Sequence, residues 1–200
     1  MVGRGRSRAV GARLSGGEAS GRRLLTEASG DLRASTGLLR SACFNILGER
    51  VVGSSVLDLF AGVGTLGLEA LSRGAAQVNF VEVSRRRGEL IRANLELLGW
   101  SDRALVVVAD AVAWLQRTPP ALYQAGLVLL DPPYRERGPE LLSSALRLLG
   151  DAALAQPGWD PVLAVEHHRQ LQVPQAVGAL HCARSSRYGT SALSFYRRQT

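Results

Sequence analysis

The stretch from Leu127 to Tyr134 carries the most specific chemical signal in the sequence, because an apolar run ends in an acid, two prolines and a tyrosine. Proline restricts the backbone and removes an N–H donor, so Asp131 and the Pro132 carbonyl offer acceptors without competing donors. Such acceptors can hold the exocyclic amino group of a base, on which Tyr134 can stack. Asp131, Pro132 and Tyr134 are the predicted catalytic residues. The alternative is a loop in which Asp131 caps and Tyr134 packs on the sheet.

A glycine-rich turn follows an earlier apolar run. Gly62, Gly64 and Gly67 form a G-x-G-x-x-G pattern, and Glu82 stands at the end of the next apolar run. On this spacing alone a dinucleotide-binding fold is a candidate, with Glu82 on a ribose. Asp58, just before the turn, favours another ligand, because a carboxylate repels a pyrophosphate and attracts a cation or an amino group. S-adenosylmethionine carries a sulfonium and an ammonium group.

With this cofactor, Glu82 is expected to accept hydrogen bonds from the ribose hydroxyls and Asp110 from the adenine amino group. The structural alternatives are a turn or helix cap for Asp58 and a helix N-cap for Asp110. The predicted cofactor-binding residues are Asp58, Phe60, Ala61, Gly62, Gly64, Glu82, Asp110 and Ala111.

Short apolar runs alternate with helical patterns, which indicates βαβ units and a mostly parallel sheet. Three predicted strands end in an acid, namely Glu82, Asp110 and Asp131, and we expect these acids to meet at the edge that binds ligands. A further strand over 192–196 is predicted at the end of the sheet. The other predicted strands are 56–60, 77–82, 104–110, 127–131 and 162–166, separated by a helix ending near 73 and by helices 86–99, 111–117 and 139–149.

The first quarter of the chain is strongly basic. Residues 1–50 hold nine Arg and four acidic residues, which is +5 of the formal net charge of +7. Clustered guanidinium groups suit phosphate backbones. A hairpin is predicted around Gly16 and Gly17, and a helix over 35–48. The predicted segments are a flexible basic tail at 1–12, an N-terminal extension at 13–50 and an α/β core at 51–200.

Composition excludes several classes of protein. The chain has 200 residues, 46% of them hydrophobic, which is enough for one domain with a continuous core. No apolar run reaches the roughly 18 residues that cross a bilayer. Cys43 and Cys182 cannot build a disulfide framework, and three histidines cannot supply a zinc cluster. We expect a cytoplasmic monomer without a membrane segment or a metal.

Several motifs together resemble a known group of enzymes. Asp58–Gly64 with Asp131–Tyr134 resembles class I S-adenosylmethionine-dependent methyltransferases that modify amino nitrogens of bases. Over residues 13–198 the chain is similar to the bacterial 16S rRNA guanine-N2 methyltransferase family. The segments that extend the resemblance are Arg22–Leu24, Leu32–Thr36, Cys43–Leu47, Leu66–Ala75, Arg187–Thr190 and Ser194–Arg197.

The resemblance implies a Rossmann-like class I methyltransferase fold, with a mostly parallel seven-stranded sheet, helices on both faces and a small N-terminal hairpin and helix. It implies methyl transfer from S-adenosylmethionine to N2 of a guanine in 16S rRNA, within the small ribosomal subunit or an assembly intermediate. The extension at 13–50 would bind RNA and cover the site. The residues implied to bind RNA are Arg22, Arg23, Arg33, Thr36, Arg40 and Asn45.

The sequence departs from the family pattern at a few positions. Ala34, Gly37 and Leu38 stand where the family usually has Pro, an acid and Arg, and Ser84 replaces an acid after the second strand. Three other functions stay open at this point. They are an adenine-N6 methyltransferase acting on DNA or RNA, a nicotinamide-dependent oxidoreductase, and a non-catalytic RNA-binding assembly factor.

Overall fold

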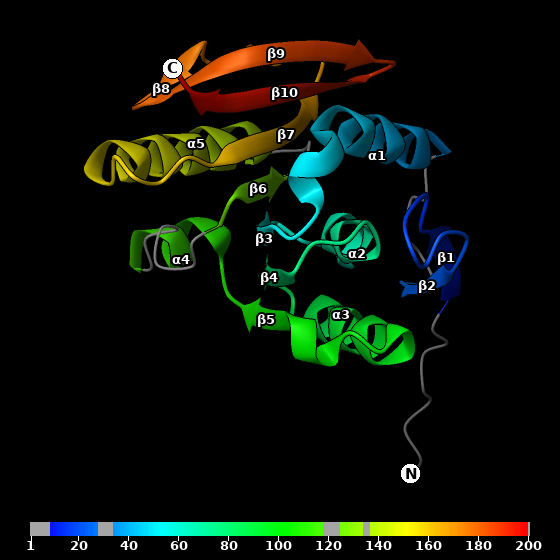
Figure 1. The fold of residues 1–200 in the computed structure, drawn as a ribbon. Helices are drawn as coiled ribbons and strands as arrows, with labels where there is room; N and C mark the ends of the chain where they lie inside the picture. The colour runs from blue at the N-terminus through cyan, green and yellow to red at the C-terminus, as the bar shows by residue number, and fades with distance from the viewer. Residues whose placement is uncertain (1–8, 28–33, 118–124, 134–136, 200) are drawn as a thin grey trace.

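A computed structural model describes residues 9–27, 34–117, 125–133 and 137–199, which form an α/β fold with a central sheet between helices (Figure 1). The strands are β1 (Ala9–Arg13), β2 (Arg23–Thr26), β3 (Ser55–Leu59), β4 (Gln77–Glu82), β5 (Ala104–Val108), β6 (Leu127–Leu130), β7 (Val162–His168), β8 (Ala176–Val177), β9 (Leu180–Tyr188) and β10 (Ser191–Arg198). The helices are α1 (Ala34–Leu47), α2 (Thr65–Ser72), α3 (Arg85–Leu98), α4 (Ala111–Arg117) and α5 (Gly138–Ala155), with short 3₁₀ turns η1 (Gly48–Val51) and η2 (Ser101–Arg103).

The main sheet has the strand order β5-β4-β3-β6-β7-β10-β9-β8. Strands β3 to β7 pair in parallel, whereas β10 lies antiparallel between β7 and β9. The prediction of a mostly parallel sheet with helices on both faces is confirmed. The sheet has eight strands where seven were expected, because the short strand β8 pairs with β9 at the edge.

The strand register brings the carboxyl ends of β3, β4 and β6 level with one another. Leu59 at the end of β3 pairs with Val81 on one side and with Leu130 on the other. Glu82 at the end of β4 pairs with Val108 of β5. The predicted strand ends are therefore confirmed to share one edge, where the chain turns into loops that begin helices.

Two apolar cores fill the space on either side of the sheet. Helices α1, α2 and α3 cover one face around Phe44, Phe80 and Ile91, and helices α4 and α5 cover the other around Trp114 and Leu149 (Figure 1). All four residues of β6 are buried, as expected for a central parallel strand between two helical layers. None of the helices in the described ranges is long and apolar enough to cross a membrane.

The N-terminal hairpin of β1 and β2 packs beside the helices α2 and α3 (Figure 1). Strand β1 begins at Ala9, so residues 9–12 of the predicted flexible tail lie in a strand, whereas residues 1–8 lie outside the described ranges. Asn94 on α3 is fully buried and binds both backbone groups of Leu25, accepting from its N–H at 2.7 Å and donating to its carbonyl at 3.0 Å. This pair joins β2 to the core.

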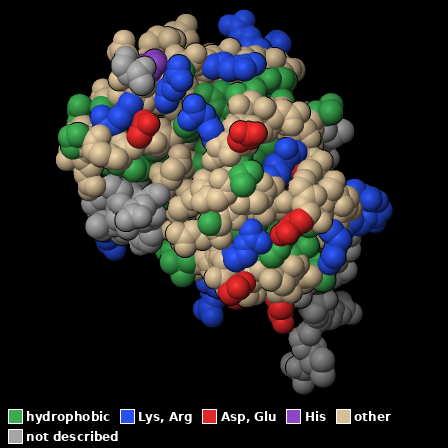
Figure 2. All heavy atoms as spheres, in the orientation of Figure 1, with side chains coloured by type: hydrophobic (Ala, Val, Ile, Leu, Met, Phe, Trp, Pro, Cys, Tyr) green, Lys and Arg blue, Asp and Glu red, His purple; other side chains and the backbone are tan. Residues whose placement is uncertain are grey.

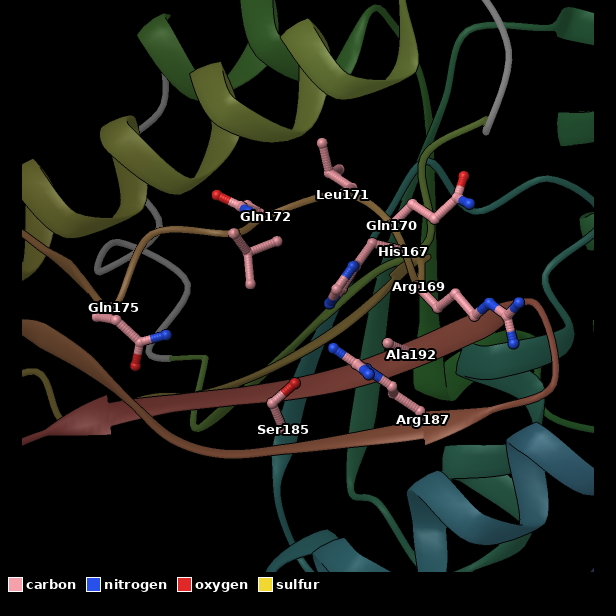
Figure 3. Close-up of a pocket in the computed structure, with 10 residues that line it drawn as sticks. His167, Arg169, Gln170, Leu171, Gln172, Gln175, Ser185, Arg187 and Ala192 are labelled. Atoms are coloured by element: carbon pink, nitrogen blue, oxygen red, sulfur yellow. The ribbon is translucent and has the colours of Figure 1, made fainter.

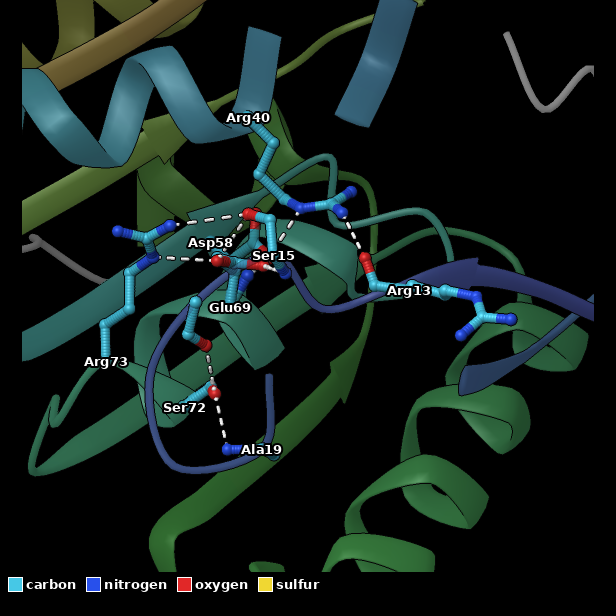
Figure 4. Close-up of polar contacts among 10 residues, drawn as sticks. Arg13, Ser15, Ala19, Arg40, Asp58, Glu69, Ser72 and Arg73 are labelled. Carbon is cyan, nitrogen blue, oxygen red and sulfur yellow. Dashed lines mark hydrogen bonds and ion pairs between the residues drawn. The ribbon is translucent and has the colours of Figure 1, made fainter. Parts of the chain in front are cut away.

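The turn of the hairpin contacts the end of α2 at very short range. Gly17 has a φ of +77°, and a Cβ there would lie 1.8 Å from the Ser72 carbonyl oxygen, so only glycine fits. The Ser72 hydroxyl donates to the Gly16 carbonyl at 2.6 Å and accepts from the Ala19 N–H at 3.0 Å (Figure 4). The turn is thereby fixed against the helix that follows the glycine-rich loop.

A buried carboxylate links the hairpin, α1 and α2. Glu69 on α2 is fully buried and accepts from the Ser15 N–H at 2.8 Å and the Ser15 hydroxyl at 2.7 Å. Its oxygens also bind Arg40 Nε at 3.1 Å and Arg73 Nε at 2.7 Å (Figure 4). Arg40 donates in addition to the Arg13 carbonyl. The extension is therefore joined to the core by charged and polar bonds around one side chain.

Candidate cofactor and active site

A cavity of 270 Å³ opens at the carboxyl ends of β3, β4, β5 and β6. It brings together the three acids that were expected to converge, Glu82, Asp110 and Asp131. Arg87 is the one basic residue among the described lining residues, so most of the charged side chains in the walls are acidic. The remaining described lining residues are Phe60, Ala61, Gly62, Val63, Thr65, Val81, Val83, Ala111, Pro133 and Leu141.

The glycine-rich loop after β3 forms one wall and begins with a residue in a conformation that is rare for its type. Phe60 has a φ of 60°, a left-handed value that is uncommon for a residue with a side chain. Glu82 fixes the loop, because its Oε2 accepts from the Gly62 N–H at 2.8 Å while its Oε1 accepts from the Ser84 N–H at 2.9 Å. The Ala61 N–H donates to the Val81 carbonyl at 3.1 Å. Loop and carboxylate thus form one rigid unit.

Asp58 lies beneath the loop rather than in the cavity wall. Its side chain is buried, and Oδ2 accepts from the Gly67 N–H at 2.9 Å. Burial raises the pKa of Asp58 to about 7; the Gly67 bond opposes this shift and the nearby Glu82 charge adds to it. A Cβ on Gly67 would lie 2.2 Å from Phe80 Cε1, so the helix start requires glycine. The bond from Gly67 is the turn-stabilising role that was considered for Asp58, and contact of Asp58 with the cofactor stays a prediction.

Gly64 also lies away from the described cavity wall. It has a φ of 83°, and a Cβ there would be 3.0 Å from Ile91 Cγ1. Asp110 caps α4, because its Oδ1 accepts from the Ala113 N–H at 2.9 Å. The residue also lines the cavity, and its contact with adenine stays a prediction. Ala111 is buried behind it and lines the same space.

The loop after β6 forms the opposite side of the cavity. Asp131 lines the cavity, and desolvation of its carboxyl group, followed by repulsion from Glu166 and Asp58, raises its pKa above the usual range. Pro132 is buried and Pro133 contributes to the cavity wall. A Cβ on Gly138 would lie 1.6 Å from the Pro133 carbonyl oxygen, so α5 can begin this close to the loop only with glycine.

Apart from Arg40, the remaining predicted residues fall into two groups. Tyr134 and Arg33 lie outside the described residues, and so does the side chain of Thr36. Arg22, Arg23 and Asn45 are exposed on the extension, where a ligand can reach them.

The prediction that Arg40 binds RNA is wrong for this conformation. Its side chain is only 7% exposed and pairs with Glu69, because the buried carboxylate needs a counter-charge.

Sequence reasoning missed several residues that line the cavity. Val83 is 66% exposed although it is apolar, and Leu141 comes from the first turn of α5. Arg87 lies with Nη1 3.9 Å from Glu82 Oε1. The position of Val83 directly after the acid that ends β4 could have identified it as a lining residue. Leu141 could not be identified from the sequence, because its place in the cavity depends on how α5 packs against the loop. In the described ranges, no group of three or more His, Cys, Asp or Glu could hold a metal ion.

Comparisons with known proteins agree with this geometry. A family model described as Conserved hypothetical protein 95 matches residues 12–197. Ribosomal RNA small subunit methyltransferase D of Escherichia coli (strain K12) is 34% identical over 191 residues, covering 94% of this chain and 90% of that protein. YlbH of Bacillus subtilis (strain 168) is 32% identical over 189 residues, covering 94% and 99%.

A solved structure extends the similarity to three dimensions. The structure of yhhF from Escherichia coli superimposes with a TM-score of 0.77 at 32% identity, covering 94% of this chain and 97% of that one. The expected fold is confirmed as that of class I methyltransferases, whose methyl donor is S-adenosylmethionine. The resemblance noted in the sequence is confirmed as well: the chain belongs to the bacterial methyltransferase family described as Conserved hypothetical protein 95.

Proposed function

We propose that this methyltransferase transfers a methyl group from S-adenosylmethionine to N2 of a guanine in 16S rRNA. The observation that carries the proposal is that the cavity lined by Glu82 and Asp110 also opens onto Asp131, where the proline loop begins. A cofactor and a base amino group can therefore meet in one space. The printed name of the Escherichia coli relative supports small-subunit rRNA as the substrate, and a cytoplasmic location would go with it.

The cavity walls fit the proposed cofactor in charge and shape. Each oxygen of Glu82 accepts one backbone N–H and retains a second lone pair, so it can also accept from a ribose hydroxyl. Asp110 can accept from the adenine amino group, and Val83 and Leu141 supply apolar surface for the ring. The acidic walls favour a cationic ligand. S-adenosylmethionine would supply the methyl group from its positively charged sulfur.

The loop after β6 is proposed to hold the target base. Asp131 and the Pro132 carbonyl accept the amino hydrogens and orient the nitrogen lone pair, and Tyr134 stacks on the ring. Orientation of this kind can supply most of the rate acceleration. The Asp131 carboxylate can also accept the proton that leaves the methylated nitrogen.

The extension over 13–50 is proposed to bind the RNA and to cover the site. Its exposed residues Arg22, Arg23 and Asn45 are suited to contact RNA, and Arg33 and Thr36 are proposed to join them from the sequence pattern alone. Arg40 is left out of this set because Glu69 holds it inside the protein.

The test is methyl transfer from labelled S-adenosylmethionine to small ribosomal subunits that lack guanine-N2 methylation. Naked 16S rRNA and duplex DNA serve as parallel substrates, and nucleosides from each product are separated and identified. We expect label in N2-methylguanosine from RNA and none in DNA. Label in N6-methyladenosine would overturn the base assignment, and cofactor binding without transfer to any substrate would overturn the enzyme assignment in favour of an assembly factor.

A further inference from the structure

A second, larger cavity lies on the face of the sheet that α5 covers, beside the end of β7. It has a volume of 740 Å³, within the range of about 300–1,000 Å³ that small-molecule sites occupy. The chain that leaves β7 forms one side of it, and strands β9 and β10 form the other (Figure 3). Its walls include His167, Arg169, Gln170, Leu171, Arg187 and Ala192.

The strand register explains why there is space between the two sides. Ala192 on β10 pairs with His167 on β7 and with Arg187 on β9, so these three side chains stand in a row across the sheet. The middle side chain, that of Ala192, is only a methyl group. Larger neighbours on both sides of a small residue leave a depression, and the Arg187 side chain lies along its rim (Figure 3).

This cavity is positively charged, in contrast to the cofactor cavity. Its described lining includes Arg169 and Arg187 and no Asp or Glu. Neither guanidinium forms an ion pair with a carboxylate in the described ranges, although Arg169 Nη1 donates to the Gly189 carbonyl at 3.1 Å. Figure 2 shows blue arginine side chains gathered at the upper end of the molecule, over β9 and β10. An anion is therefore the ligand that the charge favours.

His167 adds no charge to the cavity. Burial lowers its pKa, so the imidazole is neutral at pH 7. Its Nδ1–H donates to the His168 carbonyl at 3.0 Å, which leaves Nε2 to accept from the Ser194 hydroxyl at 2.9 Å. Ser185 extends this chain at 3.0 Å from Ser194. The floor of the cavity is thus fixed and neutral, and its net positive charge comes from the two arginines.

The second cavity reaches the proposed catalytic loop. His167 and Leu171 line it and also line a smaller space of 30 Å³ whose other walls include Pro132 and Pro133. A strand of RNA whose target base enters beside Asp131 would therefore have its next phosphate close to this side of the protein. The amides of Gln170 and Gln172 both donate and accept, which suits the edge of a neighbouring base.

We propose that this cavity binds the phosphodiester and nucleotide that flank the methylated base, with Arg187 and Arg169 as the phosphate ligands. The proposal rests on the proposed function, because it takes the RNA strand to pass over the loop after β6. Arginine suits this role, since its planar fork can hold two phosphate oxygens.

The test compares Arg187→Gln with Arg184→Gln in the full chain. Both arginines are exposed on β9, but Arg184 faces the opposite side of the sheet and lines a different cavity, with Phe195. Binding of a short fluorescent single-stranded RNA is measured over a series of salt concentrations, together with binding of S-adenosylmethionine. We expect Arg187→Gln to weaken RNA binding about tenfold and to reduce the salt slope by about 0.7, the value for one lost phosphate contact. Cofactor binding should not change.

Arg169→Gln should act in the same direction, and Arg184→Gln should match the wild type. Equal RNA binding by the two β9 variants would refute the inference even if the wild type methylates guanine. A wild type that transfers no methyl group but shows the Arg187 effect would refute the proposed reaction and leave the RNA site standing. A wild type that binds no RNA would overturn both.

Discussion

Replacing Glu69 by Gln removes the charge at the junction of the hairpin, α1 and α2. The carboxylate is fully buried and accepts four bonds, two from Ser15 and one each from Arg40 and Arg73. A Gln side chain has one carbonyl oxygen and an amide that can only donate, so it can replace at most part of this set. Arg40, whose side chain is 7% exposed, would be left without its counter-charge.

The size of the effect follows from the burial of this cluster. Removing one partner of a buried ion pair costs about 3–5 kcal/mol of unfolding free energy, because the remaining charge stays desolvated. For a domain of this length, each kcal/mol lowers the melting temperature by about 2–4 °C. We therefore expect the melting temperature of Glu69→Gln to fall by roughly 6–20 °C.

Thermal and urea unfolding of the wild type, Glu69→Gln and Glu89→Gln provide the assay. Glu89 makes the same kind of pair with Arg85, but the two side chains are 60% and 85% exposed, so this control should unfold like the wild type. If Glu69→Gln proves as stable as the control, the cluster does not hold the extension to the core and the argument from burial is refuted.

Three further predictions concern the site and the core. Burial raises the pKa of Asp58 to about 7 from an ordinary 3.8, so the unfolding free energy of the wild type falls as the pH rises between these values. Asp58→Asn lacks this titration and should gain stability relative to the wild type over the same range. Urea unfolding should show a gain of up to about 1.4 kcal/mol per pH unit. Gly138→Ala should cut methyl transfer about 100-fold, since its Cβ would meet the Pro133 carbonyl oxygen at 1.6 Å and displace the loop. Burial raises the pKa of the Cys43 thiol to about 12, so iodoacetamide at pH 8 should alkylate Cys182 first, as read by peptide mass spectrometry.

Each of these predictions has an internal control. A stability difference between Asp58→Asn and the wild type that stays constant with pH would contradict the raised pKa. Gly158→Ala adds a methyl group with no neighbour within 4 Å and should keep full activity. Equal loss of activity in both glycine variants would show that the close approach of Gly138 to the Pro133 carbonyl oxygen is not the cause of the loss. Faster alkylation of Cys43 than of Cys182 would contradict the burial of the Cys43 thiol on α1.

The sequence predicts the elements whose apolar pattern is strong. The apolar runs predict the bounds of strands β3 to β7 to within a residue or two, and they correctly predict that the terminal acids meet at one edge. Strand β9 was missed because its central residues Arg184 and Ser185 are polar and exposed, so no apolar run marks it.

The roles of Asp58, Glu69 and Arg40 depended on partners that the spacing does not reveal. Glu69 binds Ser15 and Arg40 across 54 and 29 residues of chain, and nothing in the local pattern identifies these pairs. The motif places Asp58 next to the glycine-rich turn, but whether its carboxylate faces the cavity or the Gly67 N–H depends on how the loop turns. Side-chain direction is thus what the sequence left undetermined at this site.

The most direct test of the central claim compares Asp131→Asn with Asp151→Asn on small ribosomal subunits. Asp151 is an exposed carboxylate on α5, 59% accessible, and serves as the matched control. Incorporation into N2-methylguanosine and binding of S-adenosylmethionine are measured for both. We expect Asp131→Asn to lose about 100-fold or more of the transfer with cofactor affinity unchanged, because the amino group is no longer oriented. Full transfer by Asp131→Asn would contradict the account.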